Sequence, residues 1–207
     1  MGDYIVGVDE AGRGPLVGDM FVVGVICEKN KLKLLQSLGV RDSKMLSRSM
    51  REQLFHRILK VIDDYHVVRF SPRQIDSENI NQLFQKAIQE ILDDFLEKYH
   101  VVETYVDATG NANKIKGLIK RKLKFKGKLV VEYKADRNYV IVSTASIIAK
   151  VLRDRHISEL SKIYGNIGSG YPSDAKTIAW IKRYYEKFGE LPPIVRRKWK
   201  TLRKVLD

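Results

Sequence analysis

The chain has 207 residues, 44% of them hydrophobic, which is enough for one sizeable core but not comfortably for two full domains. Its longest uninterrupted apolar stretch, residues 20–27, is far shorter than the roughly 20 residues of a membrane-spanning helix, and its single cysteine excludes an intramolecular disulfide and a cysteine-built zinc site. We therefore expect a cytoplasmic protein with no membrane partner, whose formal net charge of +13 favours a polyanion as its ligand.

The positive charge is clustered along the chain. A lysine-rich surface that only maintains solubility or heat resistance would also give a high net charge. Residues 114–128, however, hold eight Lys or Arg and no acid, and residues 196–204 are basic again. Patches of one sign are typical of proteins that bind a phosphate backbone, so nucleic acid is the expected partner.

The first half of the chain predicts strands and then helices. Residues 4–8 form a short apolar run suited to a buried strand, and residues 20–27, after a glycine-rich turn, are its expected hairpin partner. Ser47 is the expected N-cap of a helix with apolar residues at helical spacing up to Ile62, and residues 66–70 return to a strand pattern.

The second half alternates helices and strands. Residues 83–96 carry a wide apolar stripe and are the clearest helix. A strand over residues 101–106 runs into Asp107, a basic amphipathic helix follows, and another strand over residues 129–133 ends near Asp136. This order predicts a mixed sheet in an α/β domain.

The C-terminal part is predicted to be helical. A long helix of small residues is expected from about residue 140 to residue 163, followed by a turn-rich loop over residues 165–174 that carries Tyr171. Ser173 is the predicted cap of a further helix, which Gly189 ends.

Acidic residues stand where two of the predicted strands end. Asp9 and Glu10 follow the first strand, and Asp107 follows a later one. If these strands are parallel neighbours, their ends lie about 5 Å apart and the acids converge, with Asp136 completing a group of four at the edge where open α/β sheets place their sites. The alternative is that each aspartate is a helix cap or a turn residue.

Converging carboxylates favour bound cations. Two unit charges about 4 Å apart repel by roughly 4 kcal/mol at an effective dielectric near 20, so such acids must protonate or hold ions. All-oxygen ligands suit Mg²⁺ or Mn²⁺, and two such ions can serve phosphodiester hydrolysis. Zinc is not favoured, because no helical i, i+4 pairing occurs among the four histidines, His56, His66, His100 and His156.

A glycine turn follows the first pair of acids. In residues 12–18 the missing side chains of Gly12 and Gly14 let the backbone approach a ligand, and Arg13 supplies a charge. By themselves these residues are equally consistent with a tight turn that has no ligand.

The stretch over residues 8–15 (VDEAGRGP) resembles the N-terminal signature of the ribonuclease HII family. Four further segments are similar to that family's motifs and occur in the same order: residues 42–44 (DSK), 134–136 (KAD), 143–154 (STASIIAKVLRD) and 170–174 (GYPSD). Together they span most of the chain. Ala175, where the family pattern leads us to expect proline, is a small departure that concerns helix initiation.

The resemblance implies a ribonuclease H-like mixed five-stranded sheet flanked by helices, with residues 1–165 as catalytic domain and residues 166–207 as a helical extension. It implies a monomeric, metal-dependent endoribonuclease that hydrolyses the RNA strand of RNA/DNA hybrids and cuts 5′ of ribonucleotides embedded in DNA. It assigns metal binding and catalysis, with Mg²⁺ or Mn²⁺ and two ions during catalysis, to the four acids, Asp9, Glu10, Asp107 and Asp136.

The resemblance also implies substrate contacts. The backbone of Gly12, Arg13 and Gly14 is expected to recognise a ribose 2′-hydroxyl, which distinguishes RNA from DNA, and Tyr171 to pack on the sugar. The expected phosphate contacts are Lys44, Lys150 and Arg153. The alternative for these three is a solvated surface charge, and for Tyr171 it is an anchor in the core.

Two rival functions have to be compared with this one. Another nuclease of the ribonuclease H-like group, such as a DNA resolvase or transposase, would use similar acids without reading the 2′-hydroxyl. A nucleic-acid-binding protein without catalysis would use only the basic surface.

Overall fold

A single mixed sheet forms the centre of the molecule. The computed structural model describes residues 2–40 and 46–206, so the segment 42–44 with Lys44 lies outside the described residues. The strand order is β3-β2-β1-β4-β5, with β1 antiparallel to β2, β2 antiparallel to β3, and β4 parallel to both β1 and β5. The strands are β1 (Tyr4–Ala11), β2 (Met20–Glu28), β3 (Asp64–Phe70), β4 (Val101–Asp107) and β5 (Lys128–Glu132). The predicted hairpin and mixed five-stranded sheet are confirmed.

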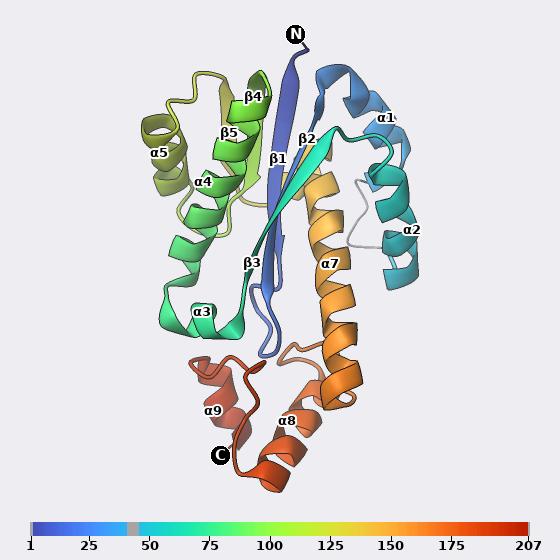
Figure 1. Ribbon diagram of the computed structural model, residues 1–207, viewed down its shortest axis with the longest axis vertical. Helices are drawn as coiled ribbons and strands as arrows, with labels where there is room; N and C mark the ends of the chain where they lie inside the picture. Colours follow the sequence, from blue (N-terminus) through green and yellow to red (C-terminus); the bar gives the residue numbers. More distant parts are fainter. Residues whose placement is uncertain (1, 41–45, 207) are drawn as a thin grey trace.

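Helices cover both faces of the sheet. In Figure 1, α4 and α5 lie to one side of it, and α7, with α1 and α2 beyond, lies to the other. The five longest helices follow predicted patterns, whereas the short ones are too brief to show an apolar stripe. The helices of the described residues are η1 (Lys29–Lys31), α1 (Leu32–Ser37), α2 (Arg48–Ile58), α3 (Pro72–Ser77), α4 (Ile80–Lys98), α5 (Ala112–Lys122), α6 (Ala135–Asn138), α7 (Val140–Tyr164), α8 (Ala175–Phe188) and α9 (Lys200–Leu206).

The two faces of β1 pack against different helices. Because side chains alternate along a strand, Val6 and Val8 point into the core under α4 and α5, while Ile5 points into the core under α7. Gly7 belongs to the α7 face, and a Cβ atom there would lie 2.5 Å from the carbonyl oxygen of Ile141. The glycine therefore allows α7 to lie directly on the central strand, where it holds the strand end that carries the acids.

Polar side chains cap the N-termini of several helices, among them the two for which the sequence predicts a cap. Ser47 caps α2 as predicted, accepting a hydrogen bond from the backbone N–H of Met50. The prediction of Ser173 as the cap of α8 is wrong, because the N-cap is Asp174. The Asp174 carboxylate accepts hydrogen bonds from the N–H groups of Lys176 at 2.9 Å and Ser169 at 2.7 Å, so it joins the start of α8 to the loop before it.

The C-terminal part packs against the far end of α7. In Figure 1, α8 and α9 lie beyond the lower end of the sheet. Their apolar side chains share a third core with Ile157 and Leu160 of α7 and with Leu16 and Val17 of the loop between β1 and β2. None of the helices in residues 2–40 and 46–206 combines the length and the apolar character needed to cross a membrane.

Candidate active site

Three buried aspartates meet at one edge of the sheet. Val8 of β1 is paired with Val106 of β4, so the next residues, Asp9 and Asp107, emerge side by side where the two parallel strands end. Asp136 comes from α6, directly after β5. One carboxylate oxygen from each aspartate lies within 4.8 Å of the other two, and the three residues are only 4–7% exposed.

The fourth predicted acid, Glu10, stands beside this trio. Adjacent residues of a strand point to opposite faces, so Glu10 follows Val8 to the face of α4 and α5 while Asp9 points to the face of α7. The Glu10 carboxylate accepts a hydrogen bond from the Thr109 hydroxyl and lies 3.8 Å from the guanidinium of Arg13. The structure thus brings three of the acids within ion-sharing distance, and Glu10 borders them from the other face.

Burial raises the pKa of two of these carboxyl groups, those of Asp9 and Glu10. Burial is the main cause that raises the pKa of Asp9, and the charges of Glu10 and Asp107 raise it further. Burial likewise raises the pKa of Glu10 from 4.5 to about 7, although Thr109 and Arg13 act in the opposite direction. Positive charge supplied close by would reverse this effect, because it stabilises the ionised form.

The donor set fits a hard divalent cation. The Glu10 side chain is 4% exposed, and its Oε2 atom accepts no hydrogen bond from the described residues. A buried oxygen without a donor is costly unless something positive faces it. Three carboxylates within 4.8 Å of one another, with a fourth alongside, present only oxygen ligands, which Mg²⁺ and Mn²⁺ prefer.

Two further groups hold the aspartates and were missed in the sequence. Lys134 has a left-handed backbone, with φ of +61°, and its N–H donates to Asp107 Oδ1 at 3.1 Å. The Ser146 hydroxyl of α7 makes a hydrogen bond with Asp9 that lowers the pKa of this carboxyl. Both residues lie within motif segments, 134–136 and 143–154, but no local pattern indicates which acid each contacts.

A cavity of about 320 Å³ opens next to the acids, and Glu10 forms part of its wall. The remaining wall includes six of the predicted substrate-binding residues, together with Ala11, Arg51 and Asp154, which were not predicted. The six are Gly12, Arg13, Gly14, Lys150, Arg153 and Tyr171. Residues as far apart in the chain as Glu10 and Tyr171 therefore line one cavity beside the carboxylates, and only Lys44 of the predicted substrate residues falls outside the described part.

Arg153 contacts the loop over residues 165–174, which carries Tyr171. It is 7% exposed, and its guanidinium lies over the Tyr171 ring at 4.5 Å from the centroid while donating to the Ser169 carbonyl. Arg153 is therefore no solvated surface charge. The ring it supports is half-buried, and a Cβ atom on Gly14 would be 3.7 Å from Tyr171 Cε1, so tyrosine and glycine turn face each other across a short gap.

Arg13 and Lys150 are also held in place. Arg13 donates to Asn81 near the start of α4 and lies 5.9 Å from the centroid of the Phe84 ring. Lys150 Nζ donates to Ser146 Oγ at 2.9 Å, so this lysine reaches the hydroxyl that also contacts Asp9. Lys150 thereby links the cavity wall to the acidic trio.

One expectation for the basic C-terminal tail is wrong. The basic run over residues 196–204 predicts a single surface patch, yet Arg196 is fully buried. Trp199 is half-buried and packs against two of the apolar cores, which holds the tail onto the molecule. The exposed basic surface therefore begins at Arg197.

Comparisons with known proteins agree with the resemblance noted in the sequence. The family model described as ribonuclease HII matches residues 6–202. The ribonuclease HII of Pyrococcus abyssi is 44% identical over 204 residues, covering 97% of this chain and 90% of its own. The crystal structure of the ribonuclease H2 from Pyrococcus horikoshii OT3 superimposes with a TM-score of 0.90 at 41% identity, covering 98% and 97% of the two chains. A PCNA:RNase HII complex from Archaeoglobus fulgidus contains a chain with a TM-score of 0.86 and 34% identity, covering 98% and 97%.

Proposed function

The chain belongs to the ribonuclease HII family, and from this premise we propose that its catalytic metal centre consists of four carboxylates, those of Asp9, Glu10, Asp107 and Asp136. As a member it is a ribonuclease H, an endonuclease that hydrolyses the RNA strand of RNA/DNA hybrids and cuts 5′ of ribonucleotides embedded in DNA. The observation that carries the metal centre is the buried trio with oxygens within 4.8 Å of one another. The family membership decides against a DNA resolvase and against a binding protein without catalysis.

We propose Mg²⁺ or Mn²⁺ as the cofactor, with two ions during catalysis. Such ions lower the pKa of a water and stabilise the charge that develops on the leaving 3′-oxygen. The chain supplies a rigid, water-poor edge of the sheet: Asp9 and Asp107 come from paired strands, and the N–H of Lys134 orients Asp107. Glu10, on the opposite face of β1, borders both the trio and the cavity, where it can orient a water or a second ion.

The cavity is the proposed site of the ribonucleotide. A ribose 2′-hydroxyl can accept hydrogen bonds from the backbone N–H groups of the glycine turn, while the sugar packs on the exposed side of the Tyr171 ring. Arg153 holds this ring by stacking on it and contacts the Ser169 carbonyl, so we assign it to positioning Tyr171. Lys150, on the cavity wall, is the proposed phosphate contact, together with Lys44.

Three further proposals concern the protein as a whole. We propose that it acts as a monomer, because the acids and the cavity wall all come from one chain, and that it is cytoplasmic, where its nucleic acid substrates occur. The proposed domains are residues 1–165 and 166–207, and the third apolar core supports an extension that packs on the end of α7. Size-exclusion chromatography with light scattering tests the monomer.

Cleavage of a defined duplex tests the metal centre. The substrate is a labelled DNA duplex with one ribonucleotide, incubated with Mg²⁺, with Mn²⁺ or with EDTA. We expect nicking 5′ of the ribonucleotide only with metal. Asp9→Asn should nearly abolish turnover and keep binding, because the variant loses an ion ligand but no part of the cavity wall. Asp93→Asn on the exposed side of α4 is the matched control. Full activity of Asp9→Asn would remove Asp9 from the metal centre.

A further inference from the structure

The guanidinium of Arg196 is enclosed by backbone carbonyls of the loop between β1 and β2. Arg196 has no exposed surface, and it belongs to the segment that joins α8 to α9. Four hydrogen bonds leave its side chain, and all acceptors lie in residues 12–18. They run from Nε and Nη2 to the Gly18 carbonyl at 3.0 and 2.8 Å, from Nη2 to the Gly12 carbonyl at 2.5 Å, and from Nη1 to the Arg13 carbonyl at 3.0 Å.

Burial of the Arg196 charge costs free energy, so the hydrogen bonds that compensate for it are needed to keep the guanidinium in place. Desolvation is the main cause that lowers the pKa of Arg196 to about 10, and the nearby charge of Arg153 acts in the same direction. A buried cation is tolerated when its donors are satisfied, and the carbonyl dipoles of the loop satisfy them here. Removing the guanidinium would leave three buried carbonyl groups without these donors.

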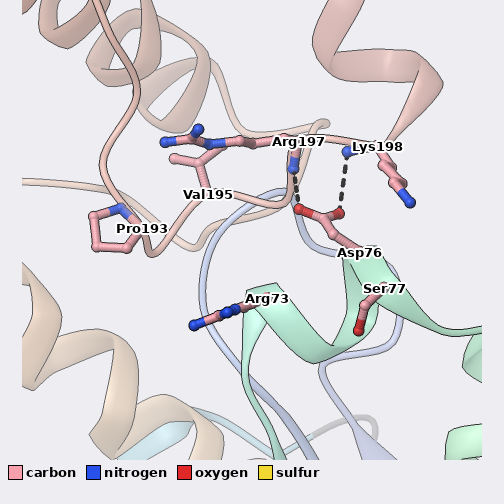
Figure 2. A pocket seen from close by; sticks show the side chains of 7 residues that line it. All are labelled: Arg73, Asp76, Ser77, Pro193, Val195, Arg197 and Lys198. Atoms are coloured by element: carbon pink, nitrogen blue, oxygen red, sulfur yellow. Dashed lines mark hydrogen bonds between the residues drawn. The ribbon is translucent and has the colours of Figure 1, made fainter.

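The backbone of the segment around Arg196 is fixed as well, both by the same loop and by α3. The N–H of Arg196 donates to the Leu16 carbonyl at 2.9 Å, and Val195 forms an isolated antiparallel β-bridge with Val17. Figure 2 shows the Asp76 carboxylate of α3 reaching the backbone nitrogens of the next two residues. These hydrogen bonds measure 2.7 Å to Arg197 and 3.0 Å to Lys198. The guanidinium is therefore held on a segment that is itself tied to α3.

The direction of the carbonyls determines the direction of the N–H groups. In a trans peptide the C=O of one residue and the N–H of the next point in opposite directions, and no peptide bond among the described residues is cis. Since the carbonyls of Gly12 and Arg13 point at Arg196, the N–H groups of Arg13 and Gly14 point away from it. Arg196 does not line the cavity, whereas these two residues do.

We propose that Arg196 is a positioning residue for substrate recognition: by binding the carbonyls of the glycine turn, it aims the N–H groups of Arg13 and Gly14 at the ribose 2′-hydroxyl. The inference rests on the proposed ribose-reading role of this turn. It assigns to a residue near the C-terminus the task of setting the conformation of a loop more than 170 residues earlier in the chain.

Kinetics on paired substrates test this role. The variants are Arg196→Lys, which keeps a donor, and Arg196→Met, which removes all of them, with the exposed neighbour Arg197→Met as the control. For each, kcat and KM are measured on a duplex with one ribonucleotide, Ki is measured for an all-DNA duplex of the same sequence, and Tm is recorded. We expect Arg196→Met to raise KM about 10-fold or more towards Ki while Ki itself stays unchanged. Arg196→Lys should recover part of the loss, and Arg197→Met should behave as the wild type.

Two results would overturn the proposal. One is a KM-to-Ki ratio that stays at the wild-type value in both Arg196 variants while Tm falls, because this would make Arg196 a purely structural residue. The other is wild-type kinetics in both variants. If Arg196→Met does not fold, the KM-to-Ki ratio of Arg196→Lys alone tests the proposal, and a ratio equal to that of the wild type contradicts it. Equal KM and Ki in the wild type would instead contradict the ribose-reading role of the turn, and so the proposed function.

Discussion

Replacement of Glu10 by glutamine should stabilise the metal-free protein at high pH. Burial raises the pKa of Glu10 to about 7 in the folded chain, against 4.5 as its ordinary value. The folded state therefore binds this proton more tightly than the unfolded state, and stability falls as pH rises from 4.5 through 7. At about 1.4 kcal/mol per pH unit the interval corresponds to roughly 3 kcal/mol, fully lost above pH 7 and restored below pH 4.5. Glu10→Gln cannot ionise and avoids this loss.

Thermal unfolding in EDTA measures the effect. For a chain of this length roughly 3 kcal/mol corresponds to a Tm difference of about 6 to 12 °C, so Glu10→Gln should exceed the wild type by that amount at pH 8 and by little at pH 5. Glu97→Gln on the exposed side of α4 is the control and should follow the wild type at both pH values. Addition of Mg²⁺ at pH 8 should raise the Tm of the wild type more than that of Glu10→Gln, because a bound cation favours the ionised carboxylate. The reasoning is refuted if Glu10→Gln and the wild type show the same Tm difference at pH 5 and pH 8.

Three further predictions concern the substrate side of the site. Tyr171→Ala should lose activity mainly on duplexes with a single ribonucleotide, compared with the exposed Tyr185→Ala; equal rates on that substrate would return Tyr171 to a structural role. Gly12→Ala should lose cleavage activity and stability, because φ is +88° and a Cβ atom would lie 2.5 Å from the Asp19 carbonyl oxygen. Its control is Gly39→Ala, where φ is +81° but no atom of the described residues lies within 4 Å of the added carbon, so equal losses of activity would show that the close approach is unimportant. The affinity of Asp9→Asn for a hybrid, measured by fluorescence anisotropy, should fall with salt at a log–log slope of about −5, as expected for about six phosphate contacts, and a slope near zero would exclude backbone binding.

The position of the acidic trio follows from features that the sequence displays locally. An apolar run that ends in acids predicts a buried strand with its charges at the tip, whereas the parallel pairing of β1 with β4 is a condition of the prediction and comes from the structure. The side to which Glu10 points also follows from strand alternation, which separates it from Asp9 and so from the single group of four acids that the strand ends alone predict. The contacts of Lys134 and Ser146 could not be predicted, because each joins residues of different elements: the N–H of Lys134, after β5, donates to Asp107 of β4, and Ser146 of α7 bonds Asp9 of β1.

Arg196 shows why the substrate side of the site is harder to predict than the metal side. In the sequence it is the first of a basic run, and its partners lie 178 to 184 residues earlier, so no local pattern distinguishes it from the exposed Arg197. In the loop that it binds, the N–H of Leu16 also donates to the carbonyl of Gly170, the residue before Tyr171. The proposed metal ligands thus stand at the ends of β1 and β4 and on α6, directly after β5, whereas the proposed ribose-reading surface is assembled from three loops that contact one another. Changes in the C-terminal segment should consequently alter substrate discrimination while leaving the acidic trio in place.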